Sequence, residues 1–315
     1  MKKLAVVALG GNALLLSGQK GTIDEQEENV YNTCNDLMSL ITKDYNIVIT
    51  HGNGPQVGNI MLCYAAGAKQ HNLPEMPLDI YGSFSQGFIG YMIEQQLRNV
   101  LEKKGLERDI ITLVTQVLVD KNDAAFKNPT KPVGPYYKRE EAEEAMKNNK
   151  TVFSKDPRGR GWRRVVPSPK PITVGNNKSI ETLARNGQIV VTVGGGGIPV
   201  FYVEPNKLQG IDAVIDKDLA SSLLAAQIKA DNFFILTDIP KVCLHFNTPQ
   251  EKTLDIVTVG EAEKYLEEGH FAPGSMAPKV RAAIEFINNG GKETIITSSK
   301  ELGKPEAGTR IVKNK

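Results

Sequence analysis

Three lysines lie in distinctive sequence contexts. One is in a loop that prolines are expected to hold rigid, and two lie where a loop is expected to lead into a helix. Lys131 lies in an Asn-Pro-Thr-Lys-Pro run, where the prolines restrict its backbone. Lys217 lies in Ile-Asp-Lys-Asp-Leu and Lys279 in Ala-Pro-Lys-Val, each ahead of an expected helix. Most lysines are solvated surface charges, but three in such contexts favour neutralisation of a bound anion. Asp218, beside Lys217, could hold the lysines together, although an Asp at a helix start is also ordinary capping.

Glycine clusters follow several of the expected strands. Glycine lets backbone N–H groups approach a ligand without a Cβ in the way, and a helix that starts there adds partial positive charge. One Gly pair after a strand is usually only a turn, whereas several clusters at strand ends favour a phosphate or another anion. The candidate phosphate-binding residues are Gly10, Gly11, Asn12, Gly52, Asn53, Gly54, Gly194 and Gly195.

Short β-branched runs alternate with stretches of 3.6-residue apolar period, which predicts βαβ units and a mainly parallel open sheet. In such sheets ligands bind beyond the carboxyl ends of the strands, where these glycines fall. We expect strands at 4–9, 46–50, 110–114, 188–193, 214–215, 233–236 and 294–297. We expect helices at 25–43, 84–104, 219–228 and 280–288, with Pro55 opening a further one.

Residues 121–170 interrupt this alternation. The segment holds thirteen Lys and Arg against six Asp and Glu, six prolines and the only tryptophan, Trp162. It is too long for an ordinary loop and predicts an inserted lid subdomain over the site. The whole chain of 315 residues has a net charge of only +2, so the lid's +7 is offset elsewhere and provides a local field that attracts small anions.

Several classes of protein are disfavoured. The balanced charge and the lack of an aromatic stacking series argue against nucleic-acid binding, and no apolar run is long enough to span a bilayer. The phosphate-binding loop of P-loop enzymes is missing, as is the protein-kinase catalytic loop. Cys34, Cys63 and Cys243 lack metal-ligand spacing and are expected to be buried thiols in a reducing, cytoplasmic setting. We expect His51 to be a structural histidine.

Taken in order along nearly the whole chain, the motifs resemble those of the carbamate kinase family. Single blocks are shared across the wider amino-acid kinase superfamily, but the Thr-Lys-Pro, Pro-Ser-Pro and four-glycine blocks together are specific. Acetylglutamate kinases carry a lysine two residues before the first Gly pair, where this chain has Ala8, and Lys131 is the expected substitute. The blocks lie at residues 8–12, 51–58, 86–91, 128–132, 165–171, 194–200, 214–220, 236–238 and 274–280.

The resemblance implies a three-layer α/β/α sandwich, a single domain over residues 1–315 and a homodimer. An N-terminal half, about 1–205 with a lid at about 121–170, would bind carbamoyl phosphate, and about 206–315 would bind ATP or ADP. Mg²⁺ would be carried by the nucleotide, with no direct protein ligand. Lys131, Lys217, Asp218 and Lys279 would be catalytic, and the nucleotide would meet Asp212, Asp238, Met276 and Lys279.

The implied reaction is carbamoyl phosphate + ADP ⇌ carbamate + ATP, typically the last, ATP-yielding step of arginine fermentation. Phosphoryl transfer depends mainly on positioning and charge neutralisation. Carbamate is already an oxyanion, so no general base is needed, and none is evident in the sequence. Two alternatives stay open: another amino-acid kinase acting on a carboxylate, as acetylglutamate kinase does, and a non-catalytic nucleotide-binding relative.

Overall fold

An eight-stranded sheet forms the centre of the computed structural model, which describes residues 2–43, 45–149, 151–156 and 159–314. Its strand order is β15-β17-β16-β12-β1-β2-β9-β3. In that order the strands span Ile256–Thr258, Thr309–Val312, Glu293–Thr297, Asn232–Leu236, Lys3–Leu9, Tyr45–His51, Ile189–Val191 and Ile110–Thr112. β16 and β17 pair antiparallel and all other neighbours pair parallel. The carboxyl ends of β12, β1, β2 and β9 therefore meet along one edge.

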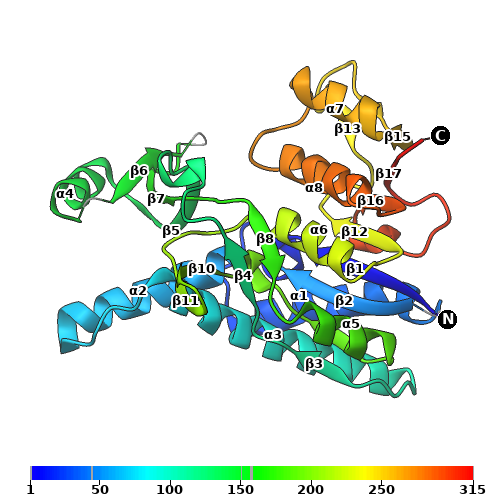
Figure 1. Cartoon of the computed structure of the whole chain (residues 1–315), viewed down its shortest axis with the longest axis horizontal. Helices are drawn as coiled ribbons and strands as arrows, with labels where there is room; N and C mark the ends of the chain where they lie inside the picture. The colour runs from blue at the N-terminus through cyan, green and yellow to red at the C-terminus, as the bar shows by residue number, and fades with distance from the viewer. Residues whose placement is uncertain (1, 44, 150, 157–158, 315) are drawn as a thin grey trace.

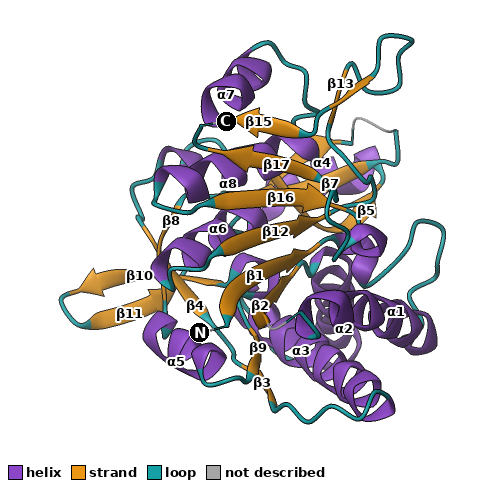
Figure 2. Cartoon of the chain, turned by 90° about the vertical axis from the view of Figure 1, so that its right-hand side faces the viewer, coloured by secondary structure: helices purple, strands orange, loops and turns teal. Residues whose placement is uncertain are grey.

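Helices cover both faces of this sheet, as Figure 2 shows. The eight described α-helices are α1 (Ile23–Ile41), α2 (Gly54–His71), α3 (Leu78–Lys103), α4 (Arg139–Asn149), α5 (Asn177–Arg185), α6 (Lys217–Gln227), α7 (Val259–Glu267) and α8 (Met276–Asn288). α1 and α3 pack on one face, and α5, α6 and α8 pack on the other. The expected α/β/α sandwich is confirmed.

The alternation of side chains along β1 explains the two layers. Val6 and Ala8 belong to the apolar cluster under α6 and α8, whereas Ala5 and Val7 belong to the cluster under α1 and α3. All four are fully buried, because helices cover a parallel sheet on both sides. β1 is thus apolar and buried from Leu4 to Leu9, up to the glycine pair that follows it.

The lid segment forms a separate three-stranded antiparallel sheet with α4, placed to one side of the central sheet in Figure 1. Its strands are β5 (Lys131–Tyr137), β6 (Val152–Lys155) and β7 (Trp162–Val166). It is inserted between two strands of a four-stranded sheet made of β4 (Gln116–Val119), β8 (Pro171–Val174), β10 (Ile198–Glu204) and β11 (Lys207–Gly210). A two-stranded sheet of β13 (Cys243–Leu244) and β14 (Lys252–Thr253) lies nearer the C-terminus.

Two expectations from the sequence are wrong. Residues 214–215 are not a strand: they lie in an irregular segment ahead of α6, where Val214 N–H donates to the carbonyl of Pro167. Val214 packs against the small apolar cluster beside the lid, and Ile215 belongs to the large cluster under α6 and α8, which accounts for the apolar character of the segment. Cys63 is exposed, because it lies on the outer side of α2, while Cys34 and Cys243 are buried as expected. No helix in the described ranges is long and apolar enough to cross a membrane.

Candidate active site

A cavity of about 430 Å³ lies at the carboxyl edge of the central sheet, bounded on one side by the lid. Loops that follow four neighbouring strands line it, namely those after β1, β2, β9 and β12. From these loops the predicted residues Gly10, Gly11, Asn12, Gly52, Asn53, Gly54, Gly195 and Asp238 all reach the lining. The glycine clusters that are far apart in the sequence thus meet around one space.

The N-termini of three helices also meet at this cavity. Residues of the first turns of α2, α6 and α8 line it, and Pro55 lies in the first turn of α2 as expected. All three N-termini bring partial positive charge; those of α2 and α8 have no side-chain cap on their backbone N–H groups, whereas Asp216 caps α6. Three of them converging on a glycine-lined space make a site for a multiply charged anion.

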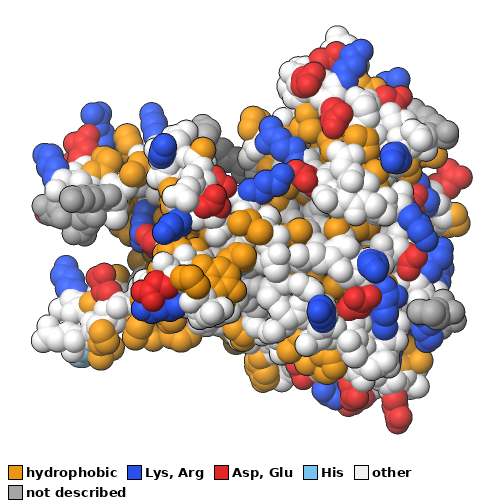
Figure 3. Space-filling model, in the orientation of Figure 1, with side chains coloured by type: hydrophobic (Ala, Val, Ile, Leu, Met, Phe, Trp, Pro, Cys, Tyr) orange, Lys and Arg blue, Asp and Glu red, His pale blue; other side chains and the backbone are white. Residues whose placement is uncertain are grey.

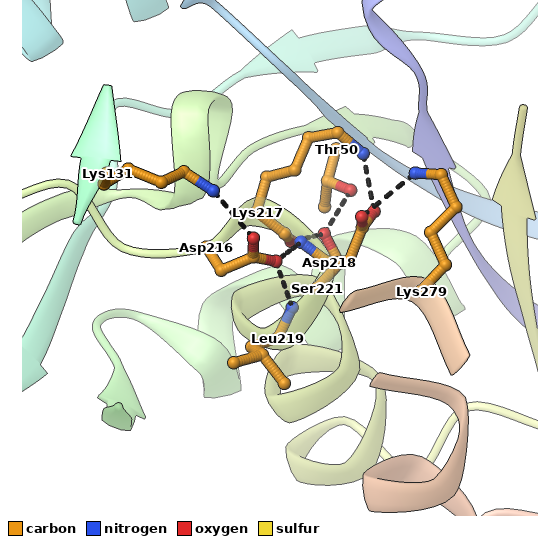
Figure 4. A network of polar contacts seen from close by, with 8 residues as sticks. All are labelled: Thr50, Lys131, Asp216, Lys217, Asp218, Leu219, Ser221 and Lys279. Carbon is orange, nitrogen blue, oxygen red and sulfur yellow. Dashed lines mark hydrogen bonds and ion pairs between the residues drawn. The ribbon is translucent and has the colours of Figure 1, made fainter. Parts of the chain in front are cut away.

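Asp218 holds two lysines together at the bottom of the cavity (Figure 4). Lys217 Nζ lies 2.5 Å from Asp218 Oδ1, and Lys279 Nζ lies 3.0 Å from Asp218 Oδ2. Lys279 comes from the first turns of α8 and the other two from the start of α6, so the carboxylate joins two helices. The arrangement that the sequence predicts for Asp218 is therefore present.

The electrostatics of this trio follow from its burial. Burial alone would raise the pKa of Asp218, but the ammonium groups of Lys217 and Lys279 outweigh it and hold that pKa well below its ordinary value. Burial lowers the pKa of Lys217, and Asp218 opposes that shift while Lys279 adds to it. Two buried cations share one anion, so the trio has an excess positive charge that a bound phosphoryl group would neutralise.

A hydrogen-bond relay fixes the start of α6 to the sheet. Ser221 Oγ donates to the carbonyl of Lys217 at 2.6 Å and lies 2.6 Å from Thr50 Oγ1 at the end of β2 (Figure 4). Because Thr50 and Ser221 are buried, this relay cannot be replaced by water without cost. The backbone that carries Lys217 and Asp218 is therefore held rigidly against the strand end.

The lid contributes the third predicted lysine. Lys131, the first residue of β5, lines the cavity and places Nζ 2.8 Å from Asp216 Oδ2. Arg163 of β7 also lines the cavity, and its guanidinium donates to the carbonyl of Gly134. Sequence reasoning did not single out Arg163, since nothing in the Trp-Arg-Arg-Val run distinguishes it from other basic residues of the lid. Only the strand pairing of β5 with β7 places it here.

Three predicted residues do not line the cavity. Gly194 is buried, and a Cβ there would lie 2.5 Å from the ring of His51, so close packing explains this glycine. Asp212 forms an ion pair with Arg164 of the lid. Met276 packs against the apolar cluster under α8, because it faces inward at the first turn of that helix. Asp216 was not among the predicted site residues, yet it also lines the cavity.

His51 is a buried structural histidine, as expected. Its Nδ1 lies 2.8 Å from the carbonyl of Gly52, and burial lowers its pKa to about 4. Its side chain is therefore neutral at neutral pH. Within the described residues, no three His, Cys, Asp or Glu side chains group as metal ligands.

Comparison with known proteins agrees with this geometry. Residues 3–298 match the model of the amino acid kinase family. The chain therefore belongs to the amino acid kinase family, and its class is that of the phosphotransferases.

Within that family the chain is similar to several carbamate kinases. The chain is 51% identical to carbamate kinase from Pyrococcus horikoshii over 296 residues, which is 94% of each chain. It is 47% identical to carbamate kinase from Pyrococcus furiosus, covering 99% of this chain and 100% of that one. The solved structure of carbamate kinase from Giardia lamblia bound to AMP-PNP superposes with a TM-score of 0.92 at 45% identity, and 99% of both chains is covered.

Proposed function

We propose that this protein is a carbamate kinase that catalyses carbamoyl phosphate + ADP ⇌ carbamate + ATP in the cavity described above. The observation that carries the proposal is the Lys217–Asp218–Lys279 trio, where helix N-termini and glycine loops converge. Such a site concentrates positive charge around one small space. This is what the transfer of a phosphoryl group between two negatively charged molecules requires.

In this proposal each group acts by binding or neutralising charge. Backbone N–H groups at Gly10, Gly11, Gly52 and Gly54 contact the transferred phosphoryl group from the sheet edge. Lys217 and Lys279 neutralise the charge that spreads over its oxygens, and Lys131 does so from the lid. Asp218 keeps the two core lysines in place against their mutual repulsion. The acceptor oxygen of carbamate already carries charge, so the reaction proceeds without a protein base.

The remaining assignments belong to the same proposal. The N-terminal half, about 1–205, binds carbamoyl phosphate, and about 206–315 binds the nucleotide, which Asp238 contacts. Mg²⁺ enters as part of the nucleotide substrate. We further propose a cytoplasmic homodimer that forms ATP at the end of arginine fermentation. These assignments rest on the family resemblance.

The direct test is ATP formation from carbamoyl phosphate and ADP in the presence of Mg²⁺, followed by a luminescent ATP assay. We expect turnover with carbamoyl phosphate and none in the reverse assay with acetylglutamate and ATP. Turnover with acetylglutamate alone would favour another carboxylate kinase, and nucleotide binding without turnover would favour a non-catalytic relative. A Lys131→Ala protein purified in parallel controls for contaminating kinases, because its activity should fall by about 10²-fold.

A further inference from the structure

Asp216 links the lid to the helix that carries the core catalytic residues. Its Oδ1 accepts hydrogen bonds from the backbone N–H groups of Asp218, at 2.9 Å, and of Leu219, at 3.3 Å, and so caps α6. Its Oδ2 accepts a hydrogen bond from Lys131 Nζ at 2.8 Å. Figure 4 shows the two interactions on opposite sides of one carboxylate. Because they use different oxygens, they exist at the same time.

The capping bonds restrict how the carboxylate can turn. A carboxylate that is hydrogen-bonded to two backbone N–H groups at a helix N-terminus is fixed in orientation and stabilised by the helix dipole. The oxygen that faces Lys131 is therefore a rigid anchor. The Lys131 side chain is 35% exposed, so without this anchor its long aliphatic chain would sample many rotamers.

Neighbouring contacts place the lid strands on the same segment. Val214 N–H donates to the Pro167 carbonyl at 3.0 Å, and Asp212 pairs with Arg164 of β7. The lid thus contacts residues 211–216, the segment directly before α6. The segment determines where β5 begins relative to the trio, and Asp216 determines where the Lys131 amine lies.

We propose that Asp216 is a positioning residue that fixes the Lys131 ammonium over the cavity, at a defined position relative to Lys217 and Lys279. This inference rests on the proposed function, since it assigns Lys131 a role in phosphoryl transfer. Asp216 itself acts through Lys131 and through the start of α6, and it needs no contact with substrate. The carboxylate would couple the placement of the lid cation to that of the two core cations.

The test is Asp216→Asn, which keeps an equally good capping side chain and removes the negative charge. We expect kcat/KM for carbamoyl phosphate to fall roughly tenfold to a hundredfold, the scale of a misplaced catalytic group, with KM for ADP unchanged. In a Lys131→Ala background the same substitution should cause no further loss. Glu285→Gln is the charge-matched control: it removes an exposed pair with Lys170 at the base of the lid and should change kcat/KM by less than about twofold.

Two results would overturn the proposal: an unchanged kcat/KM in Asp216→Asn, or an equal loss with and without Lys131, which would mean that Asp216 acts only through α6.

A second readout does not depend on activity. Pulse acetylation of the ligand-free protein, read by mass spectrometry, should modify Lys131 faster in Asp216→Asn than in wild type. If wild type makes no ATP from carbamoyl phosphate, the proposed function fails. The acetylation rates then decide whether Asp216 holds Lys131, and equal rates would reject it.

Discussion

The core and the lid supply positive charge to the same cavity in different ways. On the core side, the Lys217 and Lys279 side chains are 18% and 11% exposed and share the carboxylate of Asp218. On the lid side, the Lys131 side chain is 35% exposed and has its own partner, Asp216. Buried ammonium groups require a counter-ion, because an unpaired buried charge is strongly destabilising, whereas a partly exposed lysine remains solvated without one.

The apolar packing around the core lysines is also more extensive than the packing that holds the lid. The core lysines lie on α6 and α8, which pack over one large apolar cluster, whereas the described lid is held to α2 by a small cluster that includes Val57, Val133 and Val166. Figure 3 shows the lid and the end of α2 as separate projections on one side of the molecule. Extensive burial therefore places the core half of the site, while a small apolar cluster and a few polar contacts place the lid half.

Deletion of the lid is the strongest way to test this comparison. Val119 of β4 and Pro171 of β8 are antiparallel partners, so a short Gly-rich turn can replace residues 121–170 without stretching either strand. Because Lys131 and Arg163 are lost while the trio remains, we expect turnover to disappear and ADP binding to persist. Calorimetric titration with ADP and the assay for ATP formation measure the two properties.

The shortened protein should retain cooperative urea unfolding, which serves as the control for an intact core. Loss of ADP binding in a folded lid-deleted protein would contradict the comparison, since it would place the nucleotide against the lid. Retained turnover would equally contradict it, because the core cations alone would then suffice.

The sequence predicted the parallel sheet and the cavity edge because both depend on local patterns. Apolar runs ending in glycine, such as the one before Gly10, mark buried strands whose carboxyl ends must share an edge. The segment at 214–215 has the same apolar character, yet it forms no strand because its Val214 N–H pairs with the lid. That partner lies 47 residues earlier, and no local pattern reports it.

The site shows the same limit. Lys217, Asp218 and Lys279 could be predicted because motifs surround them, and Lys131 because prolines do. The cavity position of Arg163 and the contact of Asp216 with Lys131 could not be predicted. Each depends on how the lid strands pair and on how the lid contacts residues 211–216. Gly194 lies in the four-glycine motif, and the resemblance implied Asp212, but neither lines the cavity: Gly194 packs against His51, and Asp212 pairs with Arg164.

Substitution of one lysine from each region sharpens the comparison. Lys131→Ala and Lys279→Met should each lower kcat by roughly 10²-fold or more, because each removes a preorganised positive charge. Their effects on stability should differ. Lys279→Met leaves Lys217 and Asp218 as a neutral buried pair and fills the space of the lysine stem, so the free energy of unfolding should rise by about 1 kcal/mol.

Lys131→Ala should leave the free energy of unfolding within about 0.5 kcal/mol of wild type, since a partly exposed pair contributes little. Urea denaturation at pH 7 measures both changes. A large loss of stability in Lys279→Met would show that the trio is a structural cluster rather than a strained functional one. A large loss in Lys131→Ala would show that the lid is part of the folding core.

The last expected effect concerns the core side alone and appears only in the dependence of stability on pH. Burial, together with the nearby Lys217 ammonium, lowers the pKa of His51 from 6.5 to about 4, while the backbone carbonyl of Gly52 partly opposes the shift. Between these values the unfolded chain binds a proton that the folded protein excludes, so stability falls as pH decreases from 6.5 and levels off below about 4. The shift corresponds to roughly 3 kcal/mol. Asp218, whose pKa is held low, loses its contribution only at more acidic pH.

His51→Gln should therefore lose roughly 3 kcal/mol less than wild type between pH 7 and pH 4 in urea denaturation. Equal losses in the two proteins would mean that the His51 ring accepts a proton in the folded state, and that the core side of the site is more open to water than its burial indicates.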